Sequence, residues 1–219
     1  MVKIIWHGHA CFELRGIGST LIFDPFAGIG IPEPKAQADI VLCSHNHRDH
    51  NNASQVVKKG GTVLETYTGP YTYFNDVLIQ GIATFHDETE GSKRGRNSVY
   101  VVQLDHLTFC HLGDLGHDLT DRQIKWIGSV DVLFTPIGGG PTIGPDLATL
   151  LSEKLEPKII IPMHYNPHLL GVAEFLNKLQ SVNEFIKNKK NVKKLESPAY
   201  CITQIALPLE PIIVVLLRR

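Results

Sequence analysis

The stretch that decides the fold runs from Asp39 to His50 and has the sequence DIVLCSHNHRDH. Its first half, Asp39 to Ser44, is short, apolar and rich in β-branched residues, which predicts a buried strand. If the chain stays extended past this strand, the first two histidines project to the same side, and an Asp-His pair follows one short turn later. The strand end therefore delivers four potential metal ligands: His45, His47, Asp49 and His50.

The simplest alternative is a polar loop whose histidines are solvated or bonded to the backbone. Three imidazoles and a carboxylate within six positions argue against it, because without a cation they crowd competing bases into one small volume. Nitrogen and oxygen donors at this spacing are what zinc-type sites require. We therefore interpret the stretch as a metal site.

The rest of the chain indicates a mixed α/β fold. The runs 2–7, 11–14 and 20–23 predict an opening β-meander, and Asn52 with Gln55 resembles a capping box that starts a helix. Helices are expected over 53–59, 120–127, 145–155 and 172–186. Further strands are expected over 62–65, 77–80, 82–86, 98–104, 107–111, 131–135, 158–162, 201–206 and 212–217. Strand runs followed by strands alternating with helices suggest two sheets sandwiched between helices, in one domain spanning 1–219.

Composition excludes several classes of function. The chain has 219 residues, with 21 basic and 22 acidic side chains and a net charge of −1. It therefore lacks the overall positive charge that attracts nucleic acid. The four cysteines lie far apart and form no C-x-x-C pair, which suits reduced thiols in a cytoplasmic protein. The apolar runs near both ends are too short for a signal peptide or a membrane span. We expect a cytoplasmic protein without a membrane or nucleic-acid partner.

Three more candidates stand at the ends of predicted strands: His86, Asp114 and His164. Taken singly, each has an ordinary structural explanation, as a core histidine, a turn aspartate or an interfacial imidazole. Rigid scaffolds often place functional groups at strand ends, however. Together with the first cluster they give five histidines and two aspartates, enough to hold two metal ions through a shared carboxylate. Two ions about 3.5–4 Å apart can clamp a hydroxide between them.

This pattern resembles a known family. His45-Asn-His47-Arg-Asp49-His50 is similar to the H-x-H-x-D-H signature of the metallo-β-lactamase superfamily, and the later His, Gly-Asp and strand-end His follow in the family's order. Four shorter stretches resemble the small hydrolases related to L-ascorbate-6-phosphate lactonase: WHGH at 6–9, FDP at 23–25, HLGDLGH at 111–117 and PMHY at 162–165.

The resemblance implies a four-layer αβ/βα sandwich with the site at one edge between the sheets. It implies a first metal ion held by His45, His47 and His86, and a second held by Asp49, His50 and His164, with Asp114 bridging them. Either His111 or His117 could take the place of His86. The family uses two divalent ions, most often zinc (Zn²⁺), with manganese (Mn²⁺) or iron (Fe²⁺) in some branches.

The resulting hypothesis is a hydrolase in which a hydroxide bridged by two metals attacks a carbonyl or phosphoryl centre of a small anionic substrate. Asp49 would orient the nucleophile, and His9 and His117 could donate hydrogen bonds or shuttle protons. Arg94 and Arg96 would bind the anionic group, although a solvated charged loop is the simpler explanation for them.

Other functions stay open. A small phosphodiesterase or nuclease of the same superfamily is favoured only by the lysine run from Lys187 to Lys194, for which a solvated turn is the ordinary explanation. A non-catalytic metal-binding protein is the alternative of another class. Lactonase-like relatives often associate, so a homo-oligomer is a further expectation.

Overall fold

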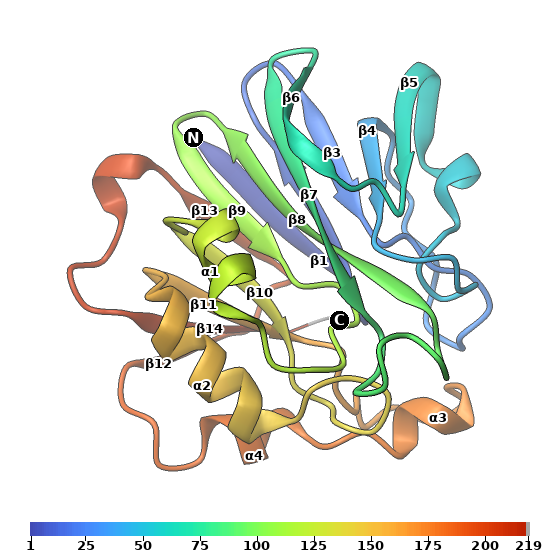
Figure 1. Cartoon of the computed structure of the whole chain (residues 1–219), viewed down its shortest axis with the longest axis vertical. Coiled ribbons are helices and arrows are strands. Elements are labelled where there is room, and N and C mark those ends of the chain that lie inside the picture. Colours follow the sequence, from blue (N-terminus) through green and yellow to red (C-terminus); the bar gives the residue numbers. More distant parts are fainter. Residues whose placement is uncertain (218–219) are drawn as a thin grey trace.

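Two β-sheets lie face to face in the computed structural model, which describes residues 1–217 (Figure 1). The six-stranded sheet has the order β13-β1-β2-β3-β4-β5. Its strands are β1 (Val2–Gly8), β2 (Cys11–Arg15), β3 (Thr20–Phe23), β4 (Ala38–Cys43), β5 (Val57–Glu65) and β13 (Ala199–Ile202). Burial alternates along β1, as expected for a strand with one face on the core.

The eight-stranded sheet has the order β12-β14-β11-β10-β9-β8-β7-β6. Its strands are β6 (Gly69–Phe74), β7 (Val77–Phe85), β8 (Arg96–Leu104), β9 (Leu107–His111), β10 (Val132–Pro136), β11 (Ile159–Met163), β12 (Val192–Leu195) and β14 (Ile212–Leu216). The parallel strands β10 and β11 are buried along their whole length. Such continuous burial indicates a strand covered on both faces.

The outer layers confirm the predicted four-layer sandwich. The helices α1 (Asp121–Ile127) and α2 (Pro145–Leu155) pack on the outside of the eight-stranded sheet, and α4 (Val182–Ile186) packs beside α2 (Figure 1). The outside of the six-stranded sheet is covered mainly by irregular chain. Its apolar layer is formed by the 25–37 loop, the 3₁₀ helix Ala53–Gln55 and α3 (Glu174–Asn177).

Two expected helices are wrong. The helix expected over 53–59 is only the 3₁₀ turn, Asn52 makes no side-chain cap, and β5 already begins at Val57. The consecutive Val56-Val57 and Gly60-Gly61 pairs disfavour a helix there. The helix expected over 172–186 is divided into α3 and α4, because the backbone of Gln180 bonds to Gly138 and Asn166 instead of to a helical neighbour.

The other differences concern strands. The pair expected over 77–80 and 82–86 is the single strand β7, and β6 and β12 were not expected. The strand expected over 201–206 ends at Ile202 and is followed by the 3₁₀ helix Gln204–Ala206. Lys193 and Lys194 lie exposed on β12, an edge strand, and not in a turn. Lysines on an edge strand oppose pairing with another chain.

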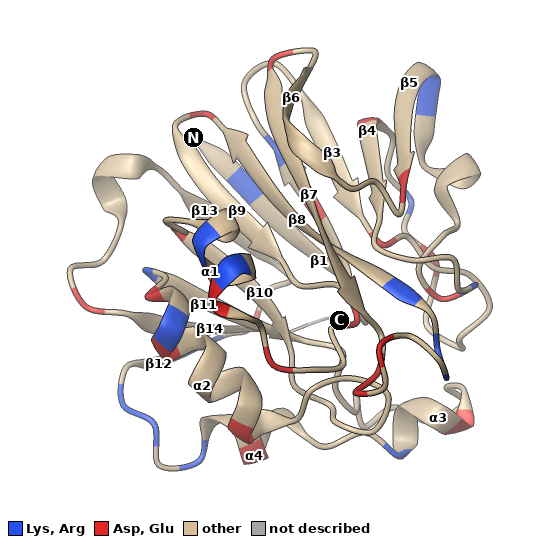
Figure 2. Ribbon diagram, in the orientation of Figure 1, with Lys and Arg blue, Asp and Glu red and all other residues tan. Residues whose placement is uncertain are grey.

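The charges support no single basic face. Figure 2 shows acidic and basic positions interspersed along the ribbon, with mostly uncharged strands in the middle of the sandwich. Within residues 1–217 no helix is long and apolar enough to cross a membrane.

A buried tyrosine links the two sheets near the functional loops. The Tyr100 hydroxyl, on β8, lies 3.0 Å from the Cys43 carbonyl and 3.1 Å from the Leu64 carbonyl of the other sheet, and it accepts the Tyr67 N–H at 3.0 Å. Tyr100 is fully buried. The hydroxyl therefore fixes the end of β4 immediately before the histidine-rich loop.

Replacing Tyr100 by Phe is expected to lower the free energy of unfolding by about 1–3 kcal/mol, because buried backbone groups lose their partner. Urea unfolding of the metal-free protein measures the change. The control Tyr73→Phe alters a tyrosine that is 72% exposed, and it should change the value by no more than about 0.5 kcal/mol. Equal effects of the two substitutions would contradict the inter-sheet role.

Candidate metal centre

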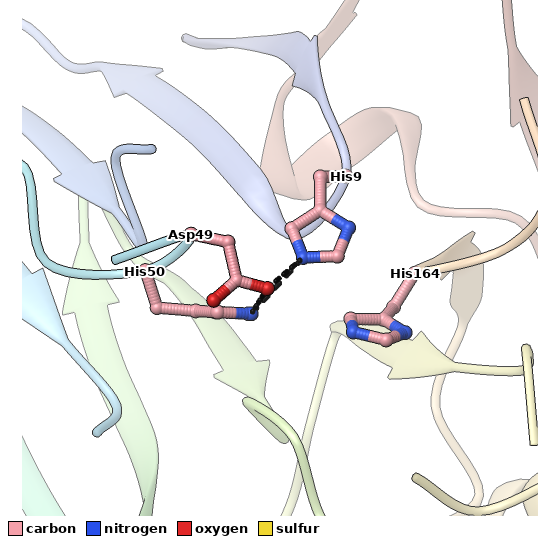
Figure 3. Close-up of side chains that lie close together, drawn as sticks. All are labelled: His9, Asp49, His50 and His164. Carbon is pink, nitrogen blue, oxygen red and sulfur yellow. Dashed lines mark hydrogen bonds and ion pairs between the residues drawn. The ribbon is translucent and has the colours of Figure 1, made fainter. Parts of the chain in front are cut away.

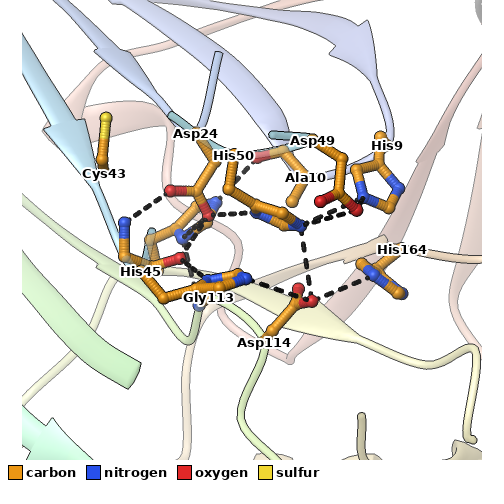
Figure 4. Close-up of polar contacts among 12 residues, drawn as sticks. His9, Ala10, Asp24, Cys43, His45, Asp49, His50, Gly113, Asp114 and His164 are labelled. Atoms are coloured by element: carbon orange, nitrogen blue, oxygen red, sulfur yellow. Dashed lines mark hydrogen bonds and ion pairs between the residues drawn. The ribbon is translucent and has the colours of Figure 1, made fainter. Parts of the chain in front are cut away.

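The candidate ligands come from the ends of strands in both sheets. The loop after β4 supplies His45, His47, Asp49 and His50, while His86 follows β7, Asp114 follows β9 and His164 follows β11. The structure brings all seven expected ligands together at one edge of the sandwich, where Figure 4 shows several of them converging. It also adds His9, from the turn between β1 and β2, to the cluster.

Asp114 lies at the centre of the cluster. Its Oδ2 atom is 3.2 Å from Nε2 of His164, 3.3 Å from Nε2 of His50 and of His86, and 3.9 Å from Nε2 of His45. Asn97 accepts the Asp114 N–H at 2.9 Å. Burial alone would raise the pKa of Asp114, but the charges of His164 and His50 hold it well below its usual range. Asp114 is therefore a buried carboxylate shared by several imidazoles.

The donor atoms fit a metal ion. Within residues 1–217, the buried His45 Nε2 and Asp114 Oδ1 atoms have no hydrogen-bond partner, although buried polar atoms are normally paired. Ligands bound to zinc at 2.0–2.1 Å lie about 3.3–3.4 Å apart in a tetrahedron, close to the separations around Asp114 Oδ2. Three groups have donor atoms within 4.8 Å of one another: His9-Asp49-His50-His164, His45-His47-His86 and His45-His50-Asp114.

A second buried carboxylate orients two of the histidines. His50 Nδ1 donates to Asp24 Oδ2 at 3.1 Å, and the Ser44 hydroxyl donates to the same oxygen at 2.8 Å. His45 Nδ1 in turn lies 2.9 Å from the Ser44 hydroxyl (Figure 4). Asp24 thus fixes both rings so that Nε2 of each faces Asp114. Asp24 follows a buried strand, as the expected ligands do, but the sequence analysis assigned it no role.

The buried charges follow from these contacts. Burial lowers the pKa of His45 to about 3 and, together with the nearby His164, that of His9 to about 4. Burial would also lower the pKa of His50, but Asp114 and Asp24 raise it well above its usual value. Burial would raise the pKa of Asp49, but the hydrogen bond from His9 and the charge of His50 lower it.

His111 and His117 lie outside the three groups of candidate donor atoms among the described residues. His111 is 2.9 Å from the Ala10 carbonyl through Nε2 and accepts the Gly113 N–H through Nδ1. His117 accepts the Phe85 N–H through Nε2 and bonds to the Asp118 carbonyl through Nδ1. Both ring nitrogens of each residue are thus bonded to backbone. The catalytic role expected for His117 stays a prediction; its ring bonds to the end of β7, immediately before His86.

A cavity of about 420 Å³ opens onto the cluster. On the cluster side it is lined by His47, Asp49, His86, Asp114 and His164. Arg94, Phe175 and Lys178 lie on its other sides. Arg96 lines instead a neighbouring cavity of about 730 Å³, together with His45 and His47. Phe175 and Lys178 were missed because a helix pattern alone does not show that α3 borders a site.

The loop that carries Arg94 is held by one carboxylate. Asp87 accepts the backbone N–H groups of Thr89, Gly91, Lys93 and Arg94 at 2.7–3.0 Å. Burial would raise the pKa of Asp87, but these bonds lower it. The 87–94 loop is thus pre-formed beside His86, with Arg94 at the cavity.

Comparison with known proteins agrees with this geometry. The family model of the beta-lactamase superfamily domain matches residues 3–164. A UPF0173 metal-dependent hydrolase of Thermoplasma volcanium is 34% identical over 228 residues, covering 90% of this chain and 98% of the relative. A UPF0173 metal-dependent hydrolase of Thermococcus onnurineus is 31% identical over 210 residues, covering 82% and 92%.

A solved crystal structure from Thermotoga maritima is also similar to this chain. That protein, assigned to the Zn-dependent hydrolases of the metallo-β-lactamase superfamily, is 38% identical, with a TM-score of 0.81 over 99% of this chain and 98% of the other. The catalytic class follows from these relatives together with the His/Asp cluster. The chain therefore belongs to the metallo-β-lactamase superfamily, among its UPF0173 metal-dependent hydrolases.

Proposed function

We propose that this hydrolase uses two divalent metal ions, zinc in the first place, to cleave a carbonyl or phosphoryl centre of a small anionic substrate such as a lactone or ester. The observation that carries the proposal is the position of Asp114 Oδ2. This atom lies within 3.3 Å of Nε2 of His86, from one expected ligand set, and of His50 and His164, from the other. A carboxylate so placed is suited to bridge two cations.

The residues divide into two ligand sets. His45, His47 and His86 would hold one ion, Asp49, His50 and His164 would hold the other, and Asp114 would be shared. Two bound ions would supply Lewis acidity, which lowers the pKa of a water molecule and stabilises negative charge on the substrate oxygen. Nitrogen and oxygen donors without thiolate suit zinc, and they also suit manganese or iron.

Asp49 is the acid best placed to act on the attacking water. Its side chain is 22% exposed and lines the cavity, whereas that of Asp114 is 3% exposed. One carboxylate oxygen is engaged by His9 at 3.2 Å. The low pKa of Asp49 keeps it ionised, so it can accept a hydrogen bond from the water and orient it.

Two cations at the cavity support an anionic substrate. Arg94 is held at the cavity by the Asp87 loop, and Lys178 borders it from α3. A guanidinium binds carboxylate or phosphate through charge-assisted hydrogen bonds. The cavity volume of about 420 Å³ is in the range of small-molecule sites. We assign the anionic group of the substrate to Arg94.

The proposal extends to the setting of the enzyme. The cysteines form no disulfide in the described part of the chain, and Cys11, Cys43 and Cys110 are buried. This usage supports a reducing compartment such as the cytoplasm. The same proposal treats residues 1–219 as one hydrolase domain, whose core side chains come from both sheets.

Asp114→Asn is expected to lower metal content and turnover together, because an amide is a poor bridging ligand. The loss in kcat should be about 100-fold or more, as for removal of a group that stabilises the transition state. Metal content by mass spectrometry and hydrolysis of a lactone and ester panel measure the two effects. The control Asp118→Asn changes a carboxylate that is 49% exposed. Full metal content with wild-type turnover in Asp114→Asn would contradict the bridging assignment.

Arg94→Gln is expected to raise KM for anionic substrates by about 10- to 100-fold with little change in kcat, because the substrate loses a hydrogen bond to a charged group. Steady-state kinetics on sugar-phosphate lactones, neutral esters and phosphodiesters test this. The matched control is Arg122→Gln, on α1. A KM that rises equally for neutral esters would refute the anion role. Preference for phosphodiesters would favour the phosphodiesterase alternative, and no turnover by the metal-loaded protein would favour a binding protein.

Asp24→Asn is expected to weaken metal binding by about 10- to 100-fold, since hydrogen-bond partners of ligands commonly have effects of this size. The amide cannot accept from His50 and Ser44 as the carboxylate does. Chelator competition measures the affinity. The control Asp39→Asn changes a carboxylate that bonds to Lys58 away from the cluster. Equal affinities in both variants would remove Asp24 from the account.

A further inference from the structure

His9 is a buried histidine that the two ligand sets leave unused, although it lies against members of one of them. Its Nε2 atom is 3.1 Å from His50 Nε2 and 3.2 Å from Asp49 Oδ2, and its ring centroid is 4.2 Å from that of His164. Figure 3 shows these four side chains approaching one another from three separate segments of the chain. His9 is only 3% exposed.

The backbone holds His9 in this position. Gly8 has φ 104° and His9 has φ 53°, so the chain makes a left-handed turn between β1 and β2. The His9 carbonyl accepts the Trp6 indole N–H at 3.1 Å and the His164 N–H at 3.2 Å. The second bond ties the turn to the backbone of an assigned ligand. The ring is thus placed by the fold and is not a mobile surface group.

The hydrogen bonds of His9 resemble those of the assigned ligands. In His111 and in His117, one ring nitrogen bonds to a backbone carbonyl and the other accepts a backbone N–H. Neither ring nitrogen of His9 has a backbone partner, and its Nδ1 is buried without any partner in residues 1–217, as is Nδ1 of His86 and of His164. His9 therefore belongs with the cluster and not with the histidines that hold loops.

The distances also favour a shared cation. His50 Nδ1 bonds to Asp24, so in the neutral ring that metal binding requires the proton is on Nδ1 and the lone pair is on the Nε2 atom that faces His9. A single N–H of His9 could satisfy either His50 or Asp49, but not both fully. A metal ion could bind His9 Nε2, His50 Nε2 and Asp49 Oδ2 at once. Their separations from His9 Nε2, 3.1 and 3.2 Å, are near the value of about 3.3–3.4 Å between ligands of tetrahedral zinc.

We propose that His9 is a further ligand of the metal ion held by Asp49, His50 and His164. The inference rests on the proposed two-metal function. The cavity at the cluster is lined by members of both ligand sets, His47 and His86 from one and Asp49 and His164 from the other, but not by His9. His9 lines instead a second cavity of about 420 Å³ on its other side, and its ring lies edge-on to that of Phe175, with ring centroids 5.9 Å apart.

His9→Asn tests this assignment. Asparagine tolerates the left-handed backbone but is too short to place a donor where Nε2 lies. The matched control is His168→Asn, since His168 is exposed and has φ 51°. In zinc titration against a chromophoric chelator, the wild type and the control should bind two equivalents. In His9→Asn one of the two should weaken by about 10- to 100-fold, and the Co²⁺ absorption spectrum should change.

Urea unfolding of the metal-free variants separates folding from ligation. Wild-type stability of apo His9→Asn with weakened zinc binding supports the proposal. Two equivalents of wild-type affinity, with an unchanged Co²⁺ spectrum, would overturn it and leave His9 as a hydrogen-bond donor to Asp49.

A measurement on the wild type decides the case even where the variant does not fold. In ¹⁵N spectra of the zinc-loaded protein with labelled histidine, the proposal requires metal-bound signals from His9, His45, His47, His50, His86 and His164. Two bound zinc ions with His9 absent from that set would overturn the His9 assignment alone. Fewer than two bound ions would overturn the two-metal function itself.

Discussion

The site depends on one electrostatic constraint: a buried carboxylate faces several imidazole nitrogens, and one of these, His45 Nε2, has no hydrogen-bond partner within residues 1–217. Asp114 Oδ2 lies 3.2–3.3 Å from three Nε2 atoms, and the rings are packed tightly enough that His45 and His50 have centroids 4.3 Å apart. Burying so many donors without a cation leaves polar atoms unpaired, which is costly. The cluster is therefore organised for metal ions, and the surrounding structure serves to hold it.

The two sheets supply that support from opposite sides. Asp24, after β3, orients His50 directly and His45 through Ser44, while Asn97, at the start of β8, holds the Asp114 backbone. These partners are carried by buried strand ends, where the backbone is fixed by the sheet. The groups that face the cavity, Arg94 and Lys178, come from a loop and a short helix. The candidate metal ligands thus follow the ends of sheet strands, and the two cations at the cavity come from elements outside the sheets.

The sequence was informative where the signal is local. The strand ending at Cys43 and the H-x-H-x-D-H spacing predicted the four neighbouring candidates, and the strand ends at His86, Asp114 and His164 predicted the rest of the cluster. It failed where tertiary contacts decide. Gln180 bonds to Gly138 and Asn166, which divides an apparently continuous helix. No local pattern could show that Asp24, 26 residues before His50, orients its ring.

We propose that two cations share Asp114. The most direct test is a crystal of the zinc-loaded protein, with diffraction recorded on both sides of the zinc absorption edge. The account predicts two anomalous peaks flanking the Asp114 carboxylate, one beside His45, His47 and His86 and the other beside Asp49, His50 and His164. A single peak, or peaks away from Asp114, in a crystal grown with excess zinc would contradict it.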